Sequence, residues 1–387
     1  MSETASSIPA RRRDFTSCLL SVGFCLIWLA GSQADEPLDF CQPVVRPADG
    51  VFGRLAAGKL IHSASELELP GGSCVVLGGF PQGNYTLELE CQVRGSNASE
   101  LVLYPRCEPC ASGWGVDGPA MSVSLAAPAG RTPRRAAQSG VTERSWQTIR
   151  LVVAGNVATL STNGCTSGRM ELDGLVSGWV AIGARGRGVC LAVSQATLTE
   201  TGFRSLFDGT SLTGWEGAGS PADRCWKTDQ DGLVCTGSEG PWLRSQRTWA
   251  NFELRLEYRI LPGGNSGVYV RVPEDGNHHG AGSGIEVQIL DDGSPRYRDL
   301  KPNQFSASLY AIEPAERGTA LAAGQWNSLG IRCVDRHYQV TQNGRLVVDL
   351  TEQQCPELLQ RLTSGYLGLQ NHSEQVWFRH MRIREIP

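Results

Sequence analysis

An internal repeat of strand-like segments is the feature that most constrains how this chain can fold. Residues 84–94 and 251–261 both begin with asparagine and an aromatic residue, and both then alternate apolar and polar residues. Alternation with a period of two is typical of strands that bury one face. Because such a segment occurs twice in similar form, we predict two copies of one β-rich unit.

Three further pairs of segments extend this repeat in the same order. The pairs are 145–149 with 325–329, the Asn-Gly dipeptides at 163–164 and 343–344, and 178–183 with 365–369. The separation between the copies grows along the chain, so the second copy has longer loops. Loops on a rigid scaffold often carry binding and catalytic residues. We therefore expect the second copy to carry the function.

The predicted secondary structure is almost entirely strand. Both Asn-Gly dipeptides predict hairpin turns, because the two central residues of a type I′ turn need positive φ. Glu357–Leu362, directly after Pro356, is the single helix candidate. Many short strands with turn signals between them predict two tandem β-sandwiches rather than βαβ units. The predicted strands are 86–93, 148–153, 252–260, 267–272, 285–290, 329–333 and 375–383.

The length of 387 residues also predicts two globular units, which join near residues 199–203. We assign residues 35–200 to a degenerate β-sandwich domain and residues 201–387 to the elaborated one. The first copy has Ala-Ile-Gly-Ala-Arg-Gly at 181–186, where the second has Gly-Leu-Gln-Asn-His at 368–372. We therefore expect the first domain to be a non-catalytic sandwich, used for packing or ligand binding.

Residues 1–34 have the organisation of a signal peptide. Arg11–Arg13 supply a positive region, Cys18–Gly31 is apolar, and Ser32 and Ala34 are the small residues of a cleavage site. The apolar stretch is shorter than the roughly 20 residues that span a bilayer, which favours cleavage over an uncleaved anchor. We expect an exported protein, periplasmic or extracellular, with no membrane span after cleavage.

The net charge and the cysteine content indicate which partners to exclude and which compartment to expect. A net charge of −4 and a pI near 5.9 argue against a nucleic-acid partner. Thirteen cysteines suit an oxidising compartment. Cys225 and Cys235 flank a predicted hairpin turn and are a candidate cross-strand pair. Cys107 and Cys110 have zinc or redox spacing, but without a second pair nearby a disulfide or structural role is favoured.

Ordered short motifs mark the second copy from about residue 203 to residue 387. The first, Leu206–Trp215, reads Leu-Phe-Asp-Gly-Thr-Ser-Leu-Thr-Gly-Trp. The others are Trp226 with Asp231–Leu233, Gly264–Arg271, Ile285–Asp291, Ser308–Tyr310, Gln325–Asn327, Asn343-Gly344, Gly368–His372 and Val376–Arg379. Taken in this order, the set resembles the 3-keto-disaccharide hydrolase family over essentially a whole domain.

The resemblance implies a fold, an activity and a partner. It implies that the chain is all-β, with two tandem concanavalin A-like jelly-roll β-sandwiches. The implied function is that of an exported carbohydrate-active hydrolase, or a lyase or hydratase, that cleaves 3-keto-glycosides or disaccharides. The alternatives are a non-catalytic carbohydrate-binding protein and a cell-surface structural protein. Near His372 the sequence departs from the family, with Asn371 and Ser373 in place of Asp and Gly, and His380 replaces the usual Asn.

The pleat of two strands predicts which polar residues share a surface. In 285–290, Val287 and Ile289 fall on one face, and Glu286 and Gln288 fall on the other. The same alternation in 267–272 turns the side chains of Tyr269 and Arg271 away from the core. We therefore expect these four polar side chains to line one groove.

Glu286 and His372 are the predicted catalytic residues. His372 is preferred among the six histidines because it closes the Gly-Leu-Gln-Asn-His run. The cofactor prediction is open: a divalent metal is one alternative, with His278 and His279 before the Glu286 strand as candidate ligands. The predicted substrate-binding residues are Asn265, Tyr269, Arg271, Gln288, Asp291, Tyr310, Gln370 and Arg379.

A single carboxylate limits the chemistry that this strand can perform. Ordinary glycoside hydrolysis uses two carboxyl groups about 5–9.5 Å apart, and Gln288 stands where a second acid would be needed. A 3-keto sugar removes this need, because the ketone acidifies the neighbouring C2–H. One base, Glu286 or His372, can then remove the C2 proton and expel the glycosidic oxygen. Arg271 or a metal would stabilise the charge on the ketone oxygen.

Overall fold

The computed structural model describes residues 54–56, 59–61, 67–71, 74–95, 100–109, 116–125, 146–185 and 189–387. The predicted signal peptide, Cys41, His62 and Cys110 lie outside the described residues. In the described part, no helix has both the length and the apolar character needed to cross a membrane. The prediction of an all-β chain is confirmed, since the described helices are four 3₁₀ turns.

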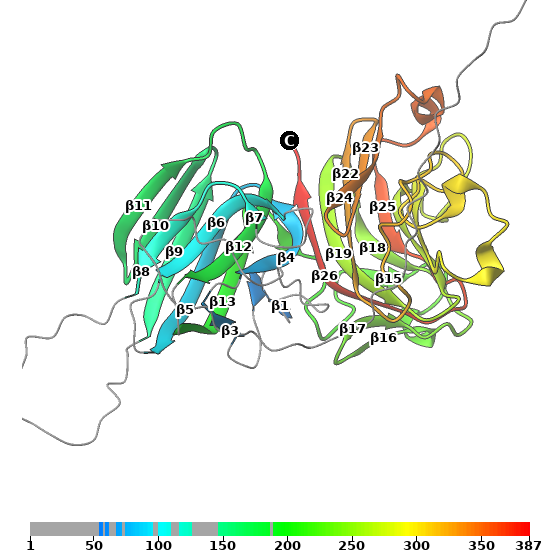
Figure 1. Ribbon diagram of the computed structural model, residues 1–387. Coiled ribbons are helices and arrows are strands. Elements are labelled where there is room, and N and C mark those ends of the chain that lie inside the picture. Colours follow the sequence, from blue (N-terminus) through cyan, green and yellow to red (C-terminus); the bar gives the residue numbers. More distant parts are fainter. Residues whose placement is uncertain are drawn as a thin grey trace, which may run out of the picture. The chain divides into compact units, whose positions relative to one another are not determined.

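Strands between residues 54 and 200 form the first β-sandwich (Figure 1). One sheet has the order β1-β2-β13-β5-β9-β10-β11, with β3 also paired to β13, and the other has the order β4-β12-β6-β7, with β8 paired to β6. The strands are β1 (Arg54–Ala56), β2 (Lys59–Ile61), β3 (Leu67–Pro70), β4 (Cys74–Gln82), β5 (Tyr85–Gly95), β6 (Glu100–Pro109), β7 (Val116–Asp117), β8 (Met121–Ser124), β9 (Gln147–Ala154), β10 (Val157–Thr162), β11 (Cys165–Glu171), β12 (Gly178–Arg185) and β13 (Val189–Glu200).

Strands between residues 204 and 385 form the second β-sandwich. Its sheets have the orders β16-β17-β26-β19-β22-β23-β24, with β14 paired to β26, and β15-β18-β25-β20-β21. The strands are β14 (Arg204–Ser205), β15 (Trp215–Gly217), β16 (Trp226–Asp229), β17 (Gly232–Cys235), β18 (Leu243–Trp249), β19 (Phe252–Ile260), β20 (Asn265–Val272), β21 (Ile285–Leu290), β22 (Asn327–Val334), β23 (His337–Gln342), β24 (Arg345–Leu350), β25 (Gly365–Leu369) and β26 (Val376–Glu385). The 3₁₀ turns are η1 (Ala222–Arg224), η2 (Pro295–Tyr297), η3 (Pro302–Gln304) and η4 (Pro356–Gln360).

The two sandwiches repeat one topology, which confirms the internal repeat. In the sheet orders, β5, β9, β10 and β11 occupy the places of β19, β22, β23 and β24, and β12 occupies the place of β25. Every sequence match falls on or beside such an equivalent pair. Asn163 and Asn343 both have φ of 50° and are followed by glycines of positive φ, as the predicted hairpins require.

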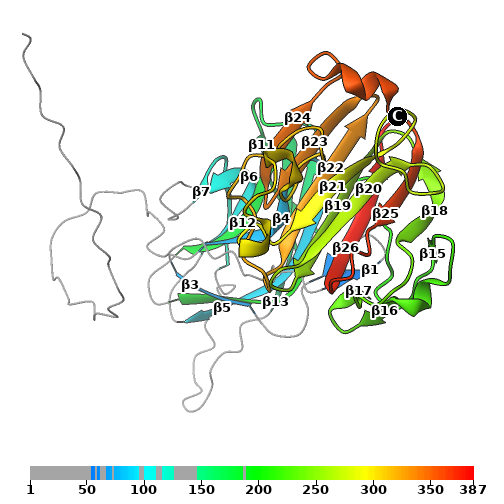
Figure 2. The same cartoon turned by 90° about the vertical axis from the view of Figure 1, so that its right-hand side faces the viewer.

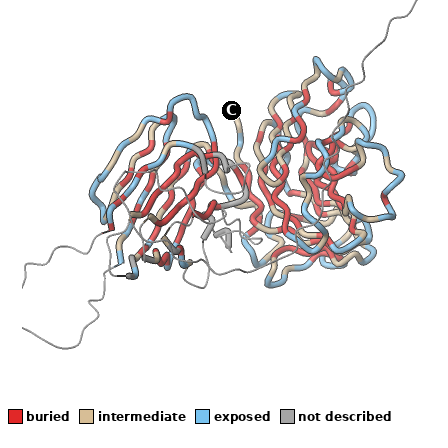
Figure 3. Tube along the Cα trace, viewed as in Figure 1, coloured by how far each residue is buried: buried red, intermediate tan, exposed pale blue. Residues whose placement is uncertain are grey.

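Each sandwich has its own hydrophobic core, formed by the inner faces of its two sheets. The first core joins residues such as Leu87 and Ile182, and the second joins residues such as Leu256 and Val287. Figure 3 shows the buried residues following the strands of both sandwiches. In the second sandwich β18, β25, β20 and β21 lie next to one another (Figure 2), and they carry the candidate site.

Two smaller expectations can be compared with the structure directly. The helix expected at 357–362 is the short 3₁₀ turn η4. Cys225 and Cys235 are buried free thiols, and the residue opposite Cys235 is Trp226 rather than Cys225. The hairpin between β16 and β17 is therefore held by its strand pairing.

Candidate functional site

The candidate site lies on the outer face of the sheet that contains β25, β20 and β21. Tyr269 of β20 is paired with Glu286 of β21 on one side and with Gly368 of β25 on the other. Residues that are directly opposite in neighbouring strands point to the same face. Val268 and Val287 point to the opposite face and belong to the core. The pleat therefore brings Tyr269 and Glu286 together, as the alternation predicts.

Glu286 is a buried carboxylate with one occupied oxygen. Its side chain is only 3% exposed, and its Oε2 lies 3.2 Å from Nε2 of His278. Its Oε1 has no hydrogen-bond partner among the described residues. A Cβ on Gly267 would lie 2.0 Å from Oε1, so a residue without a side chain is needed there. Glu286 is thus anchored through one oxygen, while the other is buried and unpaired among the described residues.

Two consecutive histidines lie beside this carboxylate, and their pKa values are shifted in opposite directions. The ring of His278 stacks on Tyr269, with centroids 4.8 Å apart, and contacts the ring of His279 at 4.0 Å. Burial alone would lower the pKa of His278, but the hydrogen bond and charge of Glu286 outweigh it and raise the pKa. Burial and the neighbouring His278 lower the pKa of His279. The pKa of His278 is therefore higher than that of its neighbour His279.

Tyr269 presents a protonated hydroxyl to the same face. Its oxygen accepts a hydrogen bond from Nε2 of Gln370 at 3.0 Å, so its own proton remains free to be donated. Burial, together with the charge of Glu286, raises the pKa of Tyr269. The edge of Trp242 packs on the ring at 5.4 Å, and a Cβ on Gly368 would lie 2.4 Å from that indole.

Tyr310 extends the group beyond the end of the loop that carries the histidines. Its backbone N–H donates to the carbonyl oxygen of Glu286 at 2.8 Å. Its hydroxyl accepts a hydrogen bond from Gln304, and its ring lies 6.1 Å from that of His279. Tyr310 thus belongs to the same neighbourhood as Glu286, although it is distant in sequence.

Three buried acceptor atoms on this face have no partner among the described residues. They are Oε1 of Glu286, Oε1 of Gln370 and Oδ1 of Asn265. Asn265, Gly267 and Tyr269 alternate along β20 and so point to one face, and the backbone N–H of Gln370 donates to the carbonyl of Gly267. Buried polar atoms are normally satisfied, so a row of unsatisfied acceptors indicates a surface that receives hydrogen-bond donors.

His372 lies at the Asn265 end of this face and makes no described hydrogen bond to Glu286. Its Nε2 is 3.4 Å from Nδ2 of Asn265, and its Nδ1 is 3.2 Å from Glu374. Its side chain is 46% exposed. Asn265 and Tyr269 are four residues apart, which is about 13 Å along a strand. The histidine next to the carboxylate is therefore His278, and His372 lies with the binding residues.

Arg271 does not join the group, which corrects the expectation from alternation. A β-bulge lies between Tyr269 and Val272, and Arg271 has a φ of 55°. The bulge reverses the side chain, because an inserted residue shifts the alternation by one. Arg271 is fully buried; its Nε donates to the carbonyl of Ala250 at 2.8 Å, and its Nη2 donates to Asn251 at 3.1 Å. It ties loops together and is not directed at the site.

Three more residues from the predicted substrate-binding set have local roles in the structure. Asp291 accepts a hydrogen bond from the backbone of Gly263 in the turn that leads into β20. Arg379 lies on β26 in the other sheet, where it pairs with Glu257 at 2.8 Å. Gln288 is opposite Gly267 on the site face, and its side-chain oxygen accepts from its neighbour's backbone N–H. Of these three, only Gln288 borders the site.

The described residues contain no group of three or more His, Cys, Asp or Glu side chains arranged to hold a metal ion. His278 and Glu286 supply two such groups, and Nδ1 of His278 lies 3.2 Å from the carbonyl oxygen of Gly276. His278 is thereby occupied at both ring nitrogens. The geometry favours proton transfer over metal ligation.

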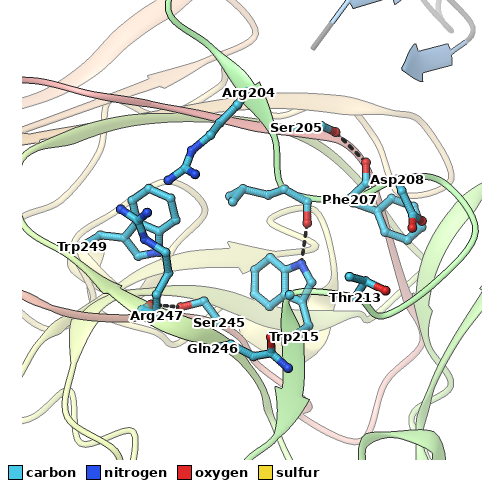
Figure 4. Close-up of a pocket in the computed structure, with 12 residues that line it drawn as sticks. Arg204, Ser205, Phe207, Asp208, Thr213, Trp215, Ser245, Gln246, Arg247 and Trp249 are labelled. Carbon is cyan, nitrogen blue, oxygen red and sulfur yellow. Dashed lines mark hydrogen bonds between the residues drawn. The ribbon is translucent and has the colours of Figure 1, made fainter. Parts of the chain in front are cut away.

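A separate pocket of about 610 Å³ opens beside β14, β15 and β18 (Figure 4). Arg204 and Arg247 both stack on Trp249, and both pair with Glu385. The carboxylate of Asp208 is bonded to its own turn, where Ser211 and Thr210 lower its pKa to about 2. This pocket offers no free base, and it shares no lining residue with the Glu286 face.

Two contributors to the site were not predicted from the sequence as such. Trp242 packs on Tyr269, but a tryptophan in a sandwich is more often a core residue, so the sequence did not single out this contact. Arg361 bonds the histidine loop from a segment about 80 residues further on. No local pattern reports that contact. The signal that was available for His278 was its place in a polar loop directly before the Glu286 strand.

The second sandwich is similar to several known proteins. Residues 202–384 match the family model of the 3-keto-alpha-glucoside-1,2-lyase-like domain. A 3-keto-disaccharide hydrolase of Bacteroides thetaiotaomicron is 27% identical over 233 residues, which are 49% of this chain and 80% of that protein. A glycosyl hydrolase candidate of Parabacteroides distasonis ATCC 8503 is 22% identical with a TM-score of 0.44, covering 48% of this chain and 94% of that one. The carbohydrate binding module CBM66 of Bacillus subtilis is 16% identical with a TM-score of 0.32, covering 44% and 96%.

Proposed function

We propose that the domain at residues 202–384, which matches the family model of the 3-keto-alpha-glucoside-1,2-lyase-like domain, cleaves 3-keto-glycosides by elimination across C1 and C2. The substrate class is a neutral disaccharide or glycoside whose C3 carries a ketone. The similarity to a 3-keto-disaccharide hydrolase supports the same class of substrate. Water then adds across the new double bond to complete a net hydrolysis.

Glu286 is the base in this proposal. The ketone at C3 acidifies the C2–H, and Oε1 of Glu286 is the oxygen with no partner in the described structure. This oxygen takes the C2 proton, and the electron pair of the C–H bond moves into the enolate. His278 holds Oε2 of Glu286 at 3.2 Å and so fixes the direction in which Oε1 points. A base with one anchored and one free oxygen is positioned for proton abstraction.

Tyr269 stabilises the enolate, and the glycosidic oxygen leaves. Because burial keeps Tyr269 protonated, its hydroxyl donates a hydrogen bond to the ketone oxygen as charge develops there. The C1–O bond then breaks, and its electron pair stays with the departing oxygen, which takes a proton. The neutral, exposed His279 carries protons between the site and solvent.

The row of three buried acceptors is the observation that carries this proposal. Sugar hydroxyls are hydrogen-bond donors, and Glu286, Gln370 and Asn265 each offer an unsatisfied acceptor on one face. A buried acceptor left unpaired costs about 1–3 kcal/mol, so a ligand with matching donors is favoured. Trp242 and Tyr269 add aromatic surface beside these acceptors.

The test is a Glu286→Gln substitution assayed with 3-keto-trehalose and 3-keto-lactose. The amide has nearly the same shape but cannot accept the C2 proton, so kcat is expected to fall roughly a thousandfold, within the range for loss of a general base. Thermal unfolding should remain close to that of the original protein. Glu316→Gln, which changes an exposed carboxylate paired with Arg345, is the matched control.

The same assay separates the competing functions. Unchanged turnover in Glu286→Gln would rule out this base. Binding of the sugar without any cleavage by the original protein would instead indicate a carbohydrate-binding module, and neither binding nor cleavage would favour a structural role. Running the assay with and without a chelator tests whether a divalent metal takes part.

A further inference from the structure

The loop that carries His278 and His279 is rich in glycine. It connects β20 to β21 over residues 273–284 and contains glycines at 276, 280 and 282, all with positive φ of 70° to 77°. Glycine lowers the cost of such turns but raises the entropy that must be lost when the loop is ordered. Contacts from outside the loop therefore add to the bond between Nδ1 of His278 and Gly276 in fixing this ring.

Arg361 supplies those contacts from the segment after η4. It is 6% exposed, and its Nη1 donates to the carbonyl oxygens of His278 at 2.9 Å and Gly284 at 3.0 Å. The same nitrogen lies 2.5 Å from Oγ of Ser283, and Nη2 binds the carboxylate of Glu357. One guanidinium thus joins the histidine to the far end of its loop, directly before Glu286.

Backbone hydrogen bonds on either side reinforce this connection. The N–H of Gly282 donates to the carbonyl of Gln360 at 2.8 Å, and the N–H of Leu362 donates to that of Ser283 at 2.9 Å. Ser283 also donates through its hydroxyl to Gly280 at 2.7 Å. The loop is therefore docked on the segment around Arg361 as a unit.

We propose that Arg361 is a positioning residue that holds the imidazole of His278 between Glu286 and Tyr269. Arg361 touches no reacting atom. It acts by fixing the backbone carbonyl of His278, whose ring orients Glu286. The expected effect of Arg361 on turnover rests on the proposed function. Its expected effect on the position of the His278 ring does not. Misplacement of a catalytic group by about 1 Å reduces rates by roughly a hundredfold.

The experiment compares Arg361→Ala and Arg361→Lys with Glu357→Gln in the full chain. With 3-keto-trehalose as substrate, Arg361→Ala is expected to lower kcat at least roughly tenfold, because misplaced groups lose rate steeply, while KM changes less. Lysine keeps a cationic donor of shorter reach and should restore part of kcat, as should added guanidinium. Glu357→Gln keeps the contacts of Nη1, and its carboxylate is about half exposed, so kcat should stay within about twofold.

A second readout does not depend on turnover. The chain has six histidines, so protein with ¹³C-labelled histidine gives few imidazole signals, and His278→Gln identifies the one from His278. In Arg361→Ala and Arg361→Lys the signals of His278 and of His279, whose ring lies 4.0 Å away, should shift or broaden, while the other histidine signals stay unchanged. If the His278 signal shifts in these variants but the original protein cleaves no 3-keto sugar, the positioning role of Arg361 is supported and the proposed function is contradicted.

Two results would overturn the inference. The first is an Arg361→Ala protein in which kcat and the His278 signal both match the original. The second is a change that affects all histidine signals together in both Arg361 variants, since that would show a general structural role. If Arg361→Ala fails to fold, Arg361→Lys decides the question by the same two measurements.

Discussion

The absence of a side chain at Gly267 makes room for the carboxylate of Glu286. The carboxylate lies in the space that any side chain on Gly267 would fill, with 2.0 Å between the added Cβ and Oε1. The backbone of β20 at this point is an ordinary strand, so glycine is needed for space and not for its conformation. Glycine is needed at 267 because the carboxylate of Glu286 lies close to the backbone of β20.

Replacing Gly267 by alanine is expected to displace the carboxylate and reduce kcat roughly a hundredfold, because small displacements of a base cost that much. The unfolding temperature should change far less than kcat, since the strand pairing is kept. Steady-state kinetics and thermal unfolding of the same preparation measure both. Gly293→Ala is the control, because its Cβ would meet only Asp291 at 3.6 Å; an equal loss in both variants would contradict the prediction.

His278, and not the predicted His372, contacts Glu286 in the structure. His372 stands in the motif that suggested catalysis, yet its neighbours are Asn265 and Glu374. His278 gains its role from a contact of 3.2 Å with Glu286 and from stacking on Tyr269. A motif therefore locates a region of the site, whereas the role of each ring depends on which residue it contacts.

At the scale of single elements, β20 contains a place where alternation fails, at the bulge after Tyr269. Up to Tyr269 the strand follows a period of two, and after it the bulge turns the side chain of Arg271 inward. The guanidinium then bonds the carbonyls of Ala250 and Asp335 and the side chain of Asn251. This part of β20 joins neighbouring loops instead of forming part of the site.

Substituting Arg271 by alanine is therefore expected to affect stability more than catalysis. Several buried acceptors would lose a charged donor, and the free energy of unfolding should fall by about 3 kcal/mol. kcat and KM for a 3-keto-disaccharide should change little. Urea unfolding and kinetics measure the two effects, and a large loss of kcat without loss of stability would return Arg271 to the site.

The loop between β20 and β21 and the turn η4 are two segments that hold each other in place. Neither has a strong sequence pattern, since one is rich in glycine and the other is a single 3₁₀ turn. Together they are joined through Arg361 and two backbone hydrogen bonds. Their order is a property of the pair, because each supplies the hydrogen-bond partners that the other lacks.

At the scale of the whole molecule, one topology is used twice, and among the residues that the structure describes the acceptor row lies in the second copy. β12 of the first sandwich occupies the place of β25 in the second. After β25 comes Gln370, with its unsatisfied oxygen, whereas the corresponding part of the first copy reads Ala-Ile-Gly-Ala-Arg-Gly. The scaffold is therefore shared, and the proposed activity depends on additions to the second copy.

We also propose that the protein is exported after cleavage before Asp35. Expressed in a host with a general secretion pathway, the full chain should yield an exported form that begins at residue 35, because the positive and apolar regions of residues 11–31 have signal-peptide character. A chain lacking residues 1–34 should stay in the cytoplasm. Mass spectrometry of the N-terminal peptide in each fraction measures this, and an exported chain that retains Met1 would contradict cleavage.

The residues alone were enough to predict the all-β class, the repeat, most strand positions and the face shared by Tyr269 and Glu286. These features follow from local chemistry: alternation decides which side of a strand is apolar, and Asn-Gly decides where a hairpin turns. Such rules act over a few neighbouring residues, so they can be read without knowing the rest of the fold.

Other features depended on contacts between distant segments. Only the tertiary structure placed His278 on Glu286, joined Arg361 to the histidine loop, and left three buried acceptors unpaired on one face. It also turned Arg271 inward, because a bulge depends on how two neighbouring strands fit together and not on either strand alone. Pairing, burial and the lack of a partner are relations between segments, and the order of residues along a chain does not contain them directly.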